Sequence, residues 1–103
     1  MDLVETPSSG AVLRLRLYVA RSTPNSVRAE HNLSLILDGL DLGTTPPELE
    51  IIDVFSQPRR AITDGIIVTP TLICQAADKR LFLMGDLTDH AQVRRVLMDL
   101  MTA

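Results

Sequence analysis

The sequence predicts one α/β domain, built on a four-stranded mixed sheet with the element order βαβ-α-ββα. Three observations predict it: apolar residues alternate over 11–20, an apolar stripe at helical spacing follows Pro24, and a β-branched run over 66–74 is interrupted by Pro70. A chain of 103 residues has the length of a single domain. We expect this domain to occupy residues 11–103, behind a flexible tail at residues 1–10.

The first half of the chain reads as strand, helix and strand. Residues 11–20 predict a strand with one buried face, because apolar side chains alternate with Arg14 and Arg16. Thr23 fits a helix N-cap, with Pro24 at the first helical position. Gly39 and Gly43 are candidate helix ends, and residues 49–55 predict a second strand, parallel to the first. The helix's predicted apolar stripe consists of Ala29, Leu33, Ile36, Leu37 and Leu40.

The second half predicts a short helix, a hairpin and a last helix. Residues 58–65 read as the short helix, with Ser56 or Gln57 as its cap. Residues 66–74 and 80–84 predict two antiparallel strands, because the connection between them is short. Thr88 or Asp89 would cap the last helix. Its apolar face would consist of Val93, Val96, Leu97, Leu100 and Met101.

Composition narrows the function classes. The net charge of −3 gives no indication of nucleic-acid binding. The N-terminus lacks the pattern of a signal peptide, and no apolar run approaches the ~20 residues of a membrane span, so we expect a cytoplasmic protein without membrane contact. A single cysteine excludes an internal disulfide. Cys74 is interpreted as a small buried hydrophobe, with a reactive thiol as the alternative.

The step Thr69-Pro70-Thr71 is how thioredoxin-like domains place a cis-proline beside their active site, so Pro70 is predicted to be a structural cis-proline. In a redox-active relative, the start of the first helix would read Cys-x-x-Cys. Here Thr23 and Ser26 occupy the two cysteine positions. Their hydroxyls cannot attack a disulfide, and we interpret both as capping groups. We therefore predict no catalytic residue and no cofactor.

The other polar residues give weak signals. His31 and His90 are expected on the surfaces of two different helices, and two histidines do not make a metal site. The spacing of the aspartates does not support acid–base pairing. The pairs Arg59–Arg60 and Arg94–Arg95 read as solvated surface, with contact to a partner as the alternative. The aspartates considered are Asp53, Asp64, Asp86 and Asp89.

One set of motifs covers segments 17–20, 23–29, 52–54, 69–72 and 85–87, with Pro58 between the third and the fourth. Together these motifs resemble the KaiB family of circadian-clock proteins over about residues 13 to 100. The resemblance implies a non-enzymatic protein that binds the hexameric ATPase KaiC, helps to time its phosphorylation cycle, sequesters the activator KaiA and competes with a KaiB-like sensor kinase. It also implies two folds: a tetrameric ground state with the order βαββααβ and a rarer monomeric thioredoxin-like state.

Two departures from the family pattern favour the thioredoxin-like state. Val96 stands where the family has glycine, and Met98 stands where it has aspartate, so both residues suit a continuous last helix better. The usual proline cluster is replaced by a plausible hairpin turn at 75–79. We predict that the chain rests in the thioredoxin-like state as a monomer, with Val96 and Met98 as fold-state determinants and the tetramer as the alternative.

The family's partner surface is altered as well, because Ser56 and Gly65 replace expected lysines. The partner-binding candidates that remain are Asn25, Ser26, Arg28, Arg59 and Arg60. A KaiC-like ATPase is the first partner expected, with KaiA-like or sensor-kinase partners next. The alternatives are a paralogue that works outside the clock, a redox or glutathione-binding protein without Cys-x-x-Cys, and a KaiB-like sensor module of a signalling kinase.

Overall fold

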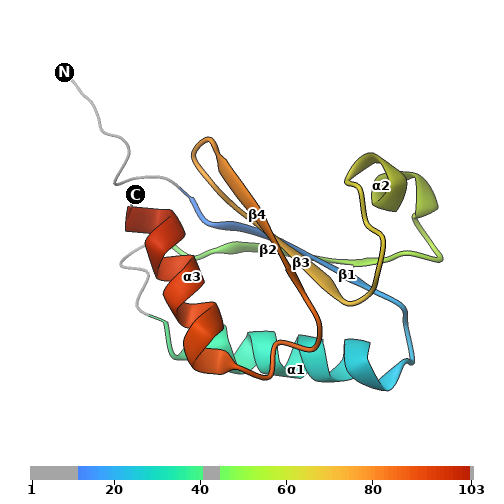
Figure 1. Cartoon of the computed structure of the whole chain (residues 1–103), viewed down its shortest axis with the longest axis horizontal. Coiled ribbons are helices and arrows are strands. Elements are labelled where there is room, and N and C mark those ends of the chain that lie inside the picture. Colours follow the sequence, from blue (N-terminus) through green and yellow to red (C-terminus); the bar gives the residue numbers. More distant parts are fainter. Residues whose placement is uncertain (1–11, 41–44, 103) are drawn as a thin grey trace.

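The computed structural model describes residues 12–40 and 45–102 and confirms the predicted element order (Figure 1). The predicted tail at residues 1–10 and Gly43 lie outside the described residues. No helix within the described ranges combines the length and apolarity of a membrane span. The elements are β1 (Arg14–Val19), α1 (Pro24–Asp38), β2 (Glu48–Asp53), α2 (Pro58–Thr63), β3 (Thr71–Ala76), β4 (Lys79–Met84) and α3 (His90–Thr102).

The four strands form one mixed sheet in the order β2-β1-β3-β4. As predicted, β1 and β2 are parallel and β3 and β4 are antiparallel, and β3 also runs antiparallel to β1. The register pairs Tyr18 with Ile52 on one side and with Thr71 on the other. The sheet edges are therefore β2 and β4.

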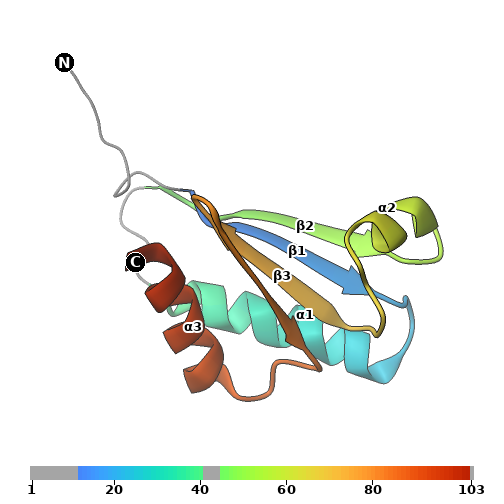
Figure 2. The same ribbon diagram turned by 45° about the horizontal axis from the view of Figure 1, so that its top comes forward.

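Helices α1 and α3 cover one face of the sheet, which we call the first face (Figure 2). Leu15 and Leu17 of β1, Leu72 of β3, Leu33 of α1 and Leu97 of α3 are all essentially inaccessible to solvent. Their burial follows from the alternation in β1 and the helical stripe in α1, because both patterns place aliphatic side chains toward the same layer. This cluster is the main core of the domain.

The opposite face, which we call the second face, carries a much smaller apolar cluster under α2. It consists of Tyr18, Ile52, Ile73 and Ala61, of which the last is the only buried residue of α2. A helix of six residues covers only one end of the sheet. Much of the second face is therefore left to polar side chains.

Three predicted strands are longer than the observed ones, and the first, predicted over 11–20, is β1 at Arg14–Val19. Val54 and Phe55 lie in a turn after β2, where the Asp53 carboxylate accepts a hydrogen bond from Ser56 Oγ at 2.8 Å. Residues 66–70 form a loop, so that β3 begins after Pro70 rather than at Ile66. The Thr69–Pro70 peptide bond is cis, the isomer expected from the sequence.

The helix ends agree with the sequence in part. Asp89 caps α3, because its Oδ1 accepts a hydrogen bond from the Gln92 amide at 3.1 Å. Gln57 stands at the N-cap position of α2, but its side chain makes no capping bond there. Residues 93–100 are helical in α3, so the structure has the thioredoxin-like order and not the alternative ground-state order.

Candidate functional site

The loops that could form a site meet at one end of the sheet. Val19 pairs with Asp53 at the ends of the parallel strands, and Thr71, at the start of β3, pairs with both Tyr18 and Met84. The loops that follow β1, β2 and β4 and the loop that precedes β3 therefore converge there. Figure 1 shows the start of α1 and the whole of α2 at this end.

The two hydroxyls at the start of α1 do not cap the helix, which corrects the sequence interpretation. Thr23 Oγ1 donates to the Ala20 carbonyl at 2.7 Å, and Ser26 Oγ accepts from the Ala20 amide at 3.0 Å. Both bonds tie the end of β1 to the first turn of α1. Ser26 is only 1% exposed, so as a partner-binding candidate it is wrong for this conformation, because its side chain is used inside the fold.

Cys74 is buried in the main core, as predicted. Burial raises the pKa of its thiol to about 12, because a thiolate would lose its hydration there. A redox role for this cysteine therefore has no support in the structure, since the reactive species is the thiolate.

A group of large apolar side chains is exposed around α2. Phe55 before the helix, Ile62 within it and Ile67 after it are 76%, 78% and 93% exposed. Val68 of the same loop and Met84, at the end of β4, are exposed as well. We call these five residues the α2 surface. Apolar side chains gathered in this way mark a binding surface more often than an isolated exposed leucine does.

An arginine flanks the α2 surface and another fixes the helix to β2. Arg59 is exposed beside Pro58. Arg60 forms a two-pronged ion pair with Glu50, with Nη2 2.8 Å from Oε1 and Nη1 bound to Oε2. These hydrogen bonds lower the pKa of Glu50. Arg59 is therefore available to a partner, while Arg60 is already engaged within the chain.

Asp64 connects α2 to the sheet. Its Oδ2 accepts a hydrogen bond from the Tyr18 hydroxyl at 2.6 Å and lies 3.2 Å from Arg16 Nη1, and its Oδ1 lies 3.3 Å from Arg80 Nη2. Burial opposes ionisation of Asp64, but the bonds from Tyr18 and Arg16 outweigh it and hold the pKa below its ordinary value. Burial and the hydrogen bond to Asp64 together raise the pKa of the Tyr18 hydroxyl to about 12.

Arg28 and Asn25 lie together on the exposed side of the first turns of α1. The Arg28 guanidinium binds the Asn25 amide oxygen and lies 3.3 Å from Asp86 Oδ2 in the loop after β4. Asp86 also accepts hydrogen bonds from Thr88. The bond from the Thr88 side chain lowers the pKa of the Asp86 carboxyl more than the bond from Arg28 does. Arg28 keeps more than half of its side chain exposed and stays a partner-binding candidate.

The histidines differ from each other. His31 is exposed, as expected. His90, expected on a helix surface, is half-buried, and its Nε2 lies 2.9 Å from Asn32 Oδ1. The Asn32 amide in turn donates to the Asp86 carbonyl at 2.8 Å. His90 therefore connects α3 to α1.

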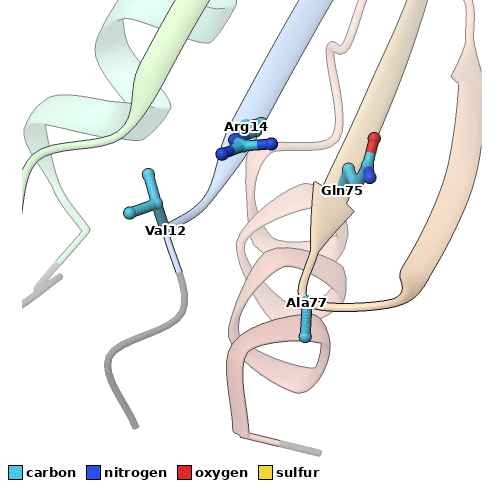
Figure 3. A pocket seen from close by; sticks show the side chains of 4 residues that line it. All are labelled: Val12, Arg14, Gln75 and Ala77. Carbon is cyan, nitrogen blue, oxygen red and sulfur yellow. The ribbon is translucent and has the colours of Figure 1, made fainter. Parts of the chain in front are cut away.

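The chemistry of a metalloenzyme is not assembled in the described parts of the chain. Within residues 12–40 and 45–102, no three histidine, cysteine or acidic side chains come together as metal ligands. Far from the α2 surface, a hollow of about 170 Å³ is lined by Val12, Arg14, Gln75 and Ala77 (Figure 3). Its two polar side chains, Arg14 and Gln75, are paired across β1 and β3 and lack a nucleophile beside them.

The two proposed fold-state determinants lie on α3. Val96 is half-buried and lines a hollow next to Leu81 of β4, whereas Met98 is exposed. Arg94 is half-buried and Arg95 is exposed on the same helix.

Comparison with known proteins decides the family. The profile of the KaiB domain matches residues 16–100. The circadian clock oscillator protein KaiB of Synechococcus sp. (strain RCC307) is 43% identical over 79 residues, which cover 77% of this chain and 70% of that protein. This chain belongs to the KaiB family. The KaiB of Acaryochloris marina (strain MBIC 11017) is 42% identical over 79 residues, covering 77% of the chain and 74% of that protein.

Solved structures agree on the fold. The N-terminal domain of SasA from Synechococcus elongatus superposes with a TM-score of 0.73 at 24% identity, covering 97% of this chain and 92% of that one. A thioredoxin from Trypanosoma brucei brucei superposes with a TM-score of 0.72 at 15% identity, covering 93% and 80%. This KaiB-family chain therefore has the thioredoxin-like fold.

Sequence reasoning missed two features of the site. The α2 surface does not stand out in the sequence, because Phe55, Ile67 and Val68 fit the pattern of strands. The bond between Tyr18 and Asp64 was hidden because the two residues are 46 positions apart. The available signal was the alternation in β1, which places Tyr18 on the face opposite Leu17 and therefore under α2.

Proposed function

We propose that this KaiB-family chain is a clock-type regulatory binding protein that docks on a KaiC-like hexameric ATPase and modulates its phosphorylation cycle. The observation that carries the proposal is the α2 surface, where Phe55, Ile62 and Ile67 are the three most exposed large apolar side chains of the described residues. Burying such side chains against a partner is favourable, at roughly 25 cal/mol per Å² of apolar surface. The α2 surface is the central contact.

The charged residues around this end of the sheet would form the rim of the interface. Arg59, Arg28 and Asn25 are exposed, and arginine binds carboxylates in two-pronged pairs. A partner with acidic side chains around an apolar groove fits this arrangement. The chain acts as a monomer in this state, with KaiA-like and sensor-kinase proteins as secondary partners.

The test is calorimetric titration of the chain into the KaiC-type ATPase of the same genome. Ile62→Ser is expected to weaken binding about tenfold or more, as truncation of a central apolar contact does. Leu35→Ser is the matched control, because Leu35 is an exposed leucine on α1, on the other side of the sheet. If the wild-type chain gives no binding heat with that ATPase at several temperatures, the proposal is wrong.

A second variant tests the rim. Arg28→Glu reverses the charge beside Asp86 and is expected to weaken binding by a few-fold and to flatten its salt dependence. In parallel, the phosphorylated fraction of the ATPase is followed over time with and without the chain. Binding without any change in phosphorylation would leave a docking protein but refute the regulatory half of the proposal.

A further inference from the structure

We propose that Asp64 is the positioning residue of the α2 surface: its carboxylate holds α2 and the following loop on the sheet in the orientation that presents Ile62 and Ile67 to a partner. The inference about positioning concerns the chain alone. Its consequence for docking rests on the proposed function.

The geometry joins three elements at one side chain. Asp64 Oδ2 receives the Tyr18 hydroxyl at 2.6 Å and Arg16 Nη1 at 3.2 Å, both from β1. Asp64 Oδ1 receives Arg80 Nη2 at 3.3 Å from β4. The Asp64 side chain is 12% exposed, whereas Arg16 and Arg80 keep 45% and 42% of their side chains in solvent. The bond from Tyr18 is therefore the most sheltered of the three, and all three are charge-assisted.

The position of Asp64 on α2 argues for this role. It is the C-cap residue, where the negative end of the helix dipole disfavours a carboxylate. The backbone after it is fixed by a Schellman motif: the Gly65 amide donates to the Ile62 carbonyl at 3.1 Å and the Ile66 amide to the Ala61 carbonyl at 2.9 Å. Gly65 allows the positive φ of 74° that this motif needs. An acidic residue at this point is unfavourable for the helix alone and becomes favourable through the two arginines.

Helix α2 has little else to hold it. It has six residues, far fewer than the ~12 that an isolated helix needs to be even marginally stable. Ala61 is its only buried residue, packed in the small cluster with Tyr18, Ile52 and Ile73. Its other anchor, Arg60 with Glu50, joins it to the edge strand β2 at a more exposed place. The orientation of the helix relative to the sheet centre therefore depends on Asp64.

Removing the carboxylate has a definite consequence. Arg16 and Arg80 would face each other without an intervening negative charge. The Tyr18 hydroxyl would keep only the Arg60 carbonyl, 3.1 Å away, which lies on the same short helix. The sheet would stay intact, because its core lies on the first face, while α2 and residues 65–70 would sample other positions.

The test is amide hydrogen exchange measured by NMR. The Ala61 and Ile66 amides report on α2, because their hydrogen bonds close the two ends of the helix. The Leu17 and Leu72 amides report on the sheet. In Asp64→Asn, the α2 amides are expected to exchange about tenfold faster or more, with sheet amides changed by less than about twofold, because a hydrogen bond to a charged group is lost locally. Glu48→Gln, an exposed member of an ion pair with Arg14 on the same face, is the matched control and should change neither set.

Tyr18→Phe keeps the aromatic ring and removes only the hydroxyl. It should speed exchange at the α2 amides by a smaller factor than Asp64→Asn does. If Asp64→Asn does not fold, Tyr18→Phe alone tests whether the bond between Tyr18 and Asp64 positions α2. Equal acceleration at α2 and sheet amides would show a general stabilising role and overturn the inference. Unchanged exchange at α2 would overturn it as well.

Binding measurements distinguish a positioning role of Asp64 from a direct contact made by Ile62. Asp64→Asn should weaken binding to the KaiC-type ATPase together with its faster exchange, whereas Ile62→Ser should weaken binding with exchange unchanged. If the wild-type chain does not bind that ATPase, the proposed function fails, while the exchange measurements still decide whether Asp64 positions α2. If Asp64→Asn binds as tightly as the wild type despite faster exchange, the consequence for docking is wrong.

Discussion

The two faces of the sheet are built differently. The first face is covered by two long helices, α1 and α3, over a continuous aliphatic core. The second face is covered by one six-residue helix, α2, held by a small apolar cluster and by Asp64. The first face supplies most of the hydrophobic stabilisation. The second face buries fewer apolar side chains and leaves Phe55, Ile62 and Ile67 exposed.

The two faces are expected to differ in how much substitution they tolerate. A dry aliphatic core is stabilised by burial and close packing, which tolerate little alteration. A short helix attached by ion pairs can be repositioned at a smaller cost in free energy. Substitutions on the second face are therefore expected to cost less stability than substitutions on the first.

The largest expected effect comes from truncating one side chain on each face. Leu17 faces the main core and Ile52 faces the small cluster, and both are completely buried. Leu17→Ala is expected to lower the free energy of unfolding by about 3–4 kcal/mol and Ile52→Ala by about 2 kcal/mol, because the smaller cluster can relax around the cavity. Urea unfolding followed by circular dichroism measures both values. Equal losses of stability would mean that the two apolar clusters respond alike to a cavity.

The first face was also the easier one to predict. The alternation in β1, the stripe in α1 and the apolar face of α3 all follow from local periodicity, and each fixes which side chains are buried. A cap at Thr88 or Asp89 follows from their place before an apolar helical pattern, and Asp89 is the one that caps α3. These signals are local in sequence, and the structure confirms them.

The second face was harder, because its apolar residues are not buried. In the sequence, Phe55 and residues 66–68 indicate strand, because β-branched and aromatic residues favour sheets. In the structure they lie in a turn and a loop, and Ile67 is almost fully exposed. Errors of this kind gather where a sequence serves binding instead of folding. The bond between Tyr18 and Asp64 depends on tertiary packing, which no local pattern reveals.

A second prediction concerns α3, the element of the first face that carries the proposed fold-state determinants. Val96→Gly combined with Met98→Asp is expected to destabilise the helical state by about 1–2 kcal/mol, because glycine disfavours a helix interior and an aspartate in its C-terminal half opposes the dipole. NMR shifts at residues 93–100 and light scattering after size exclusion measure the result. A second, non-helical set of resonances or a shift toward tetramers is expected.

Arg95→Ala is the control for that experiment, because Arg95 is exposed on the same helix and alanine favours helices. It should leave the resonances and the mass unchanged. If the double variant loses stability while residues 93–100 keep their helical shifts, Val96 and Met98 contribute to stability but do not choose between folds. Helix α3 would then keep its conformation on the first face despite both substitutions.

The smallest expected effect is a loss of stability in acid that comes from Asp64, on the second face. The folded state holds the pKa of Asp64 below its ordinary value of 3.8, since the bonds from Tyr18 and Arg16 outweigh the opposing effect of burial. The unfolded chain therefore binds a proton at Asp64 more readily than the folded chain does. The stabilisation from Asp64 is complete above about pH 5 and is lost as the pH falls below 3.8 through the folded pKa.

The matching experiment compares the free energy of unfolding of the wild type with that of Asp64→Asn from pH 7 to pH 2. Asp53 and Asp86, whose folded pKa values are also lowered, destabilise both proteins in acid and cancel in the difference. Glu50, whose folded pKa is lowered mainly by Arg60, also interacts with the Asp64 charge and cancels only in part. The wild type should be the more stable protein at neutral pH, and the gap should close in acid. Tyr18→Phe should show a smaller gap that closes in the same range, because one of the bonds that favour the carboxylate is missing. Parallel curves would mean that Asp64 adds no net stability through its charge, and α2 would then be held to the second face by its apolar cluster and Arg60 alone.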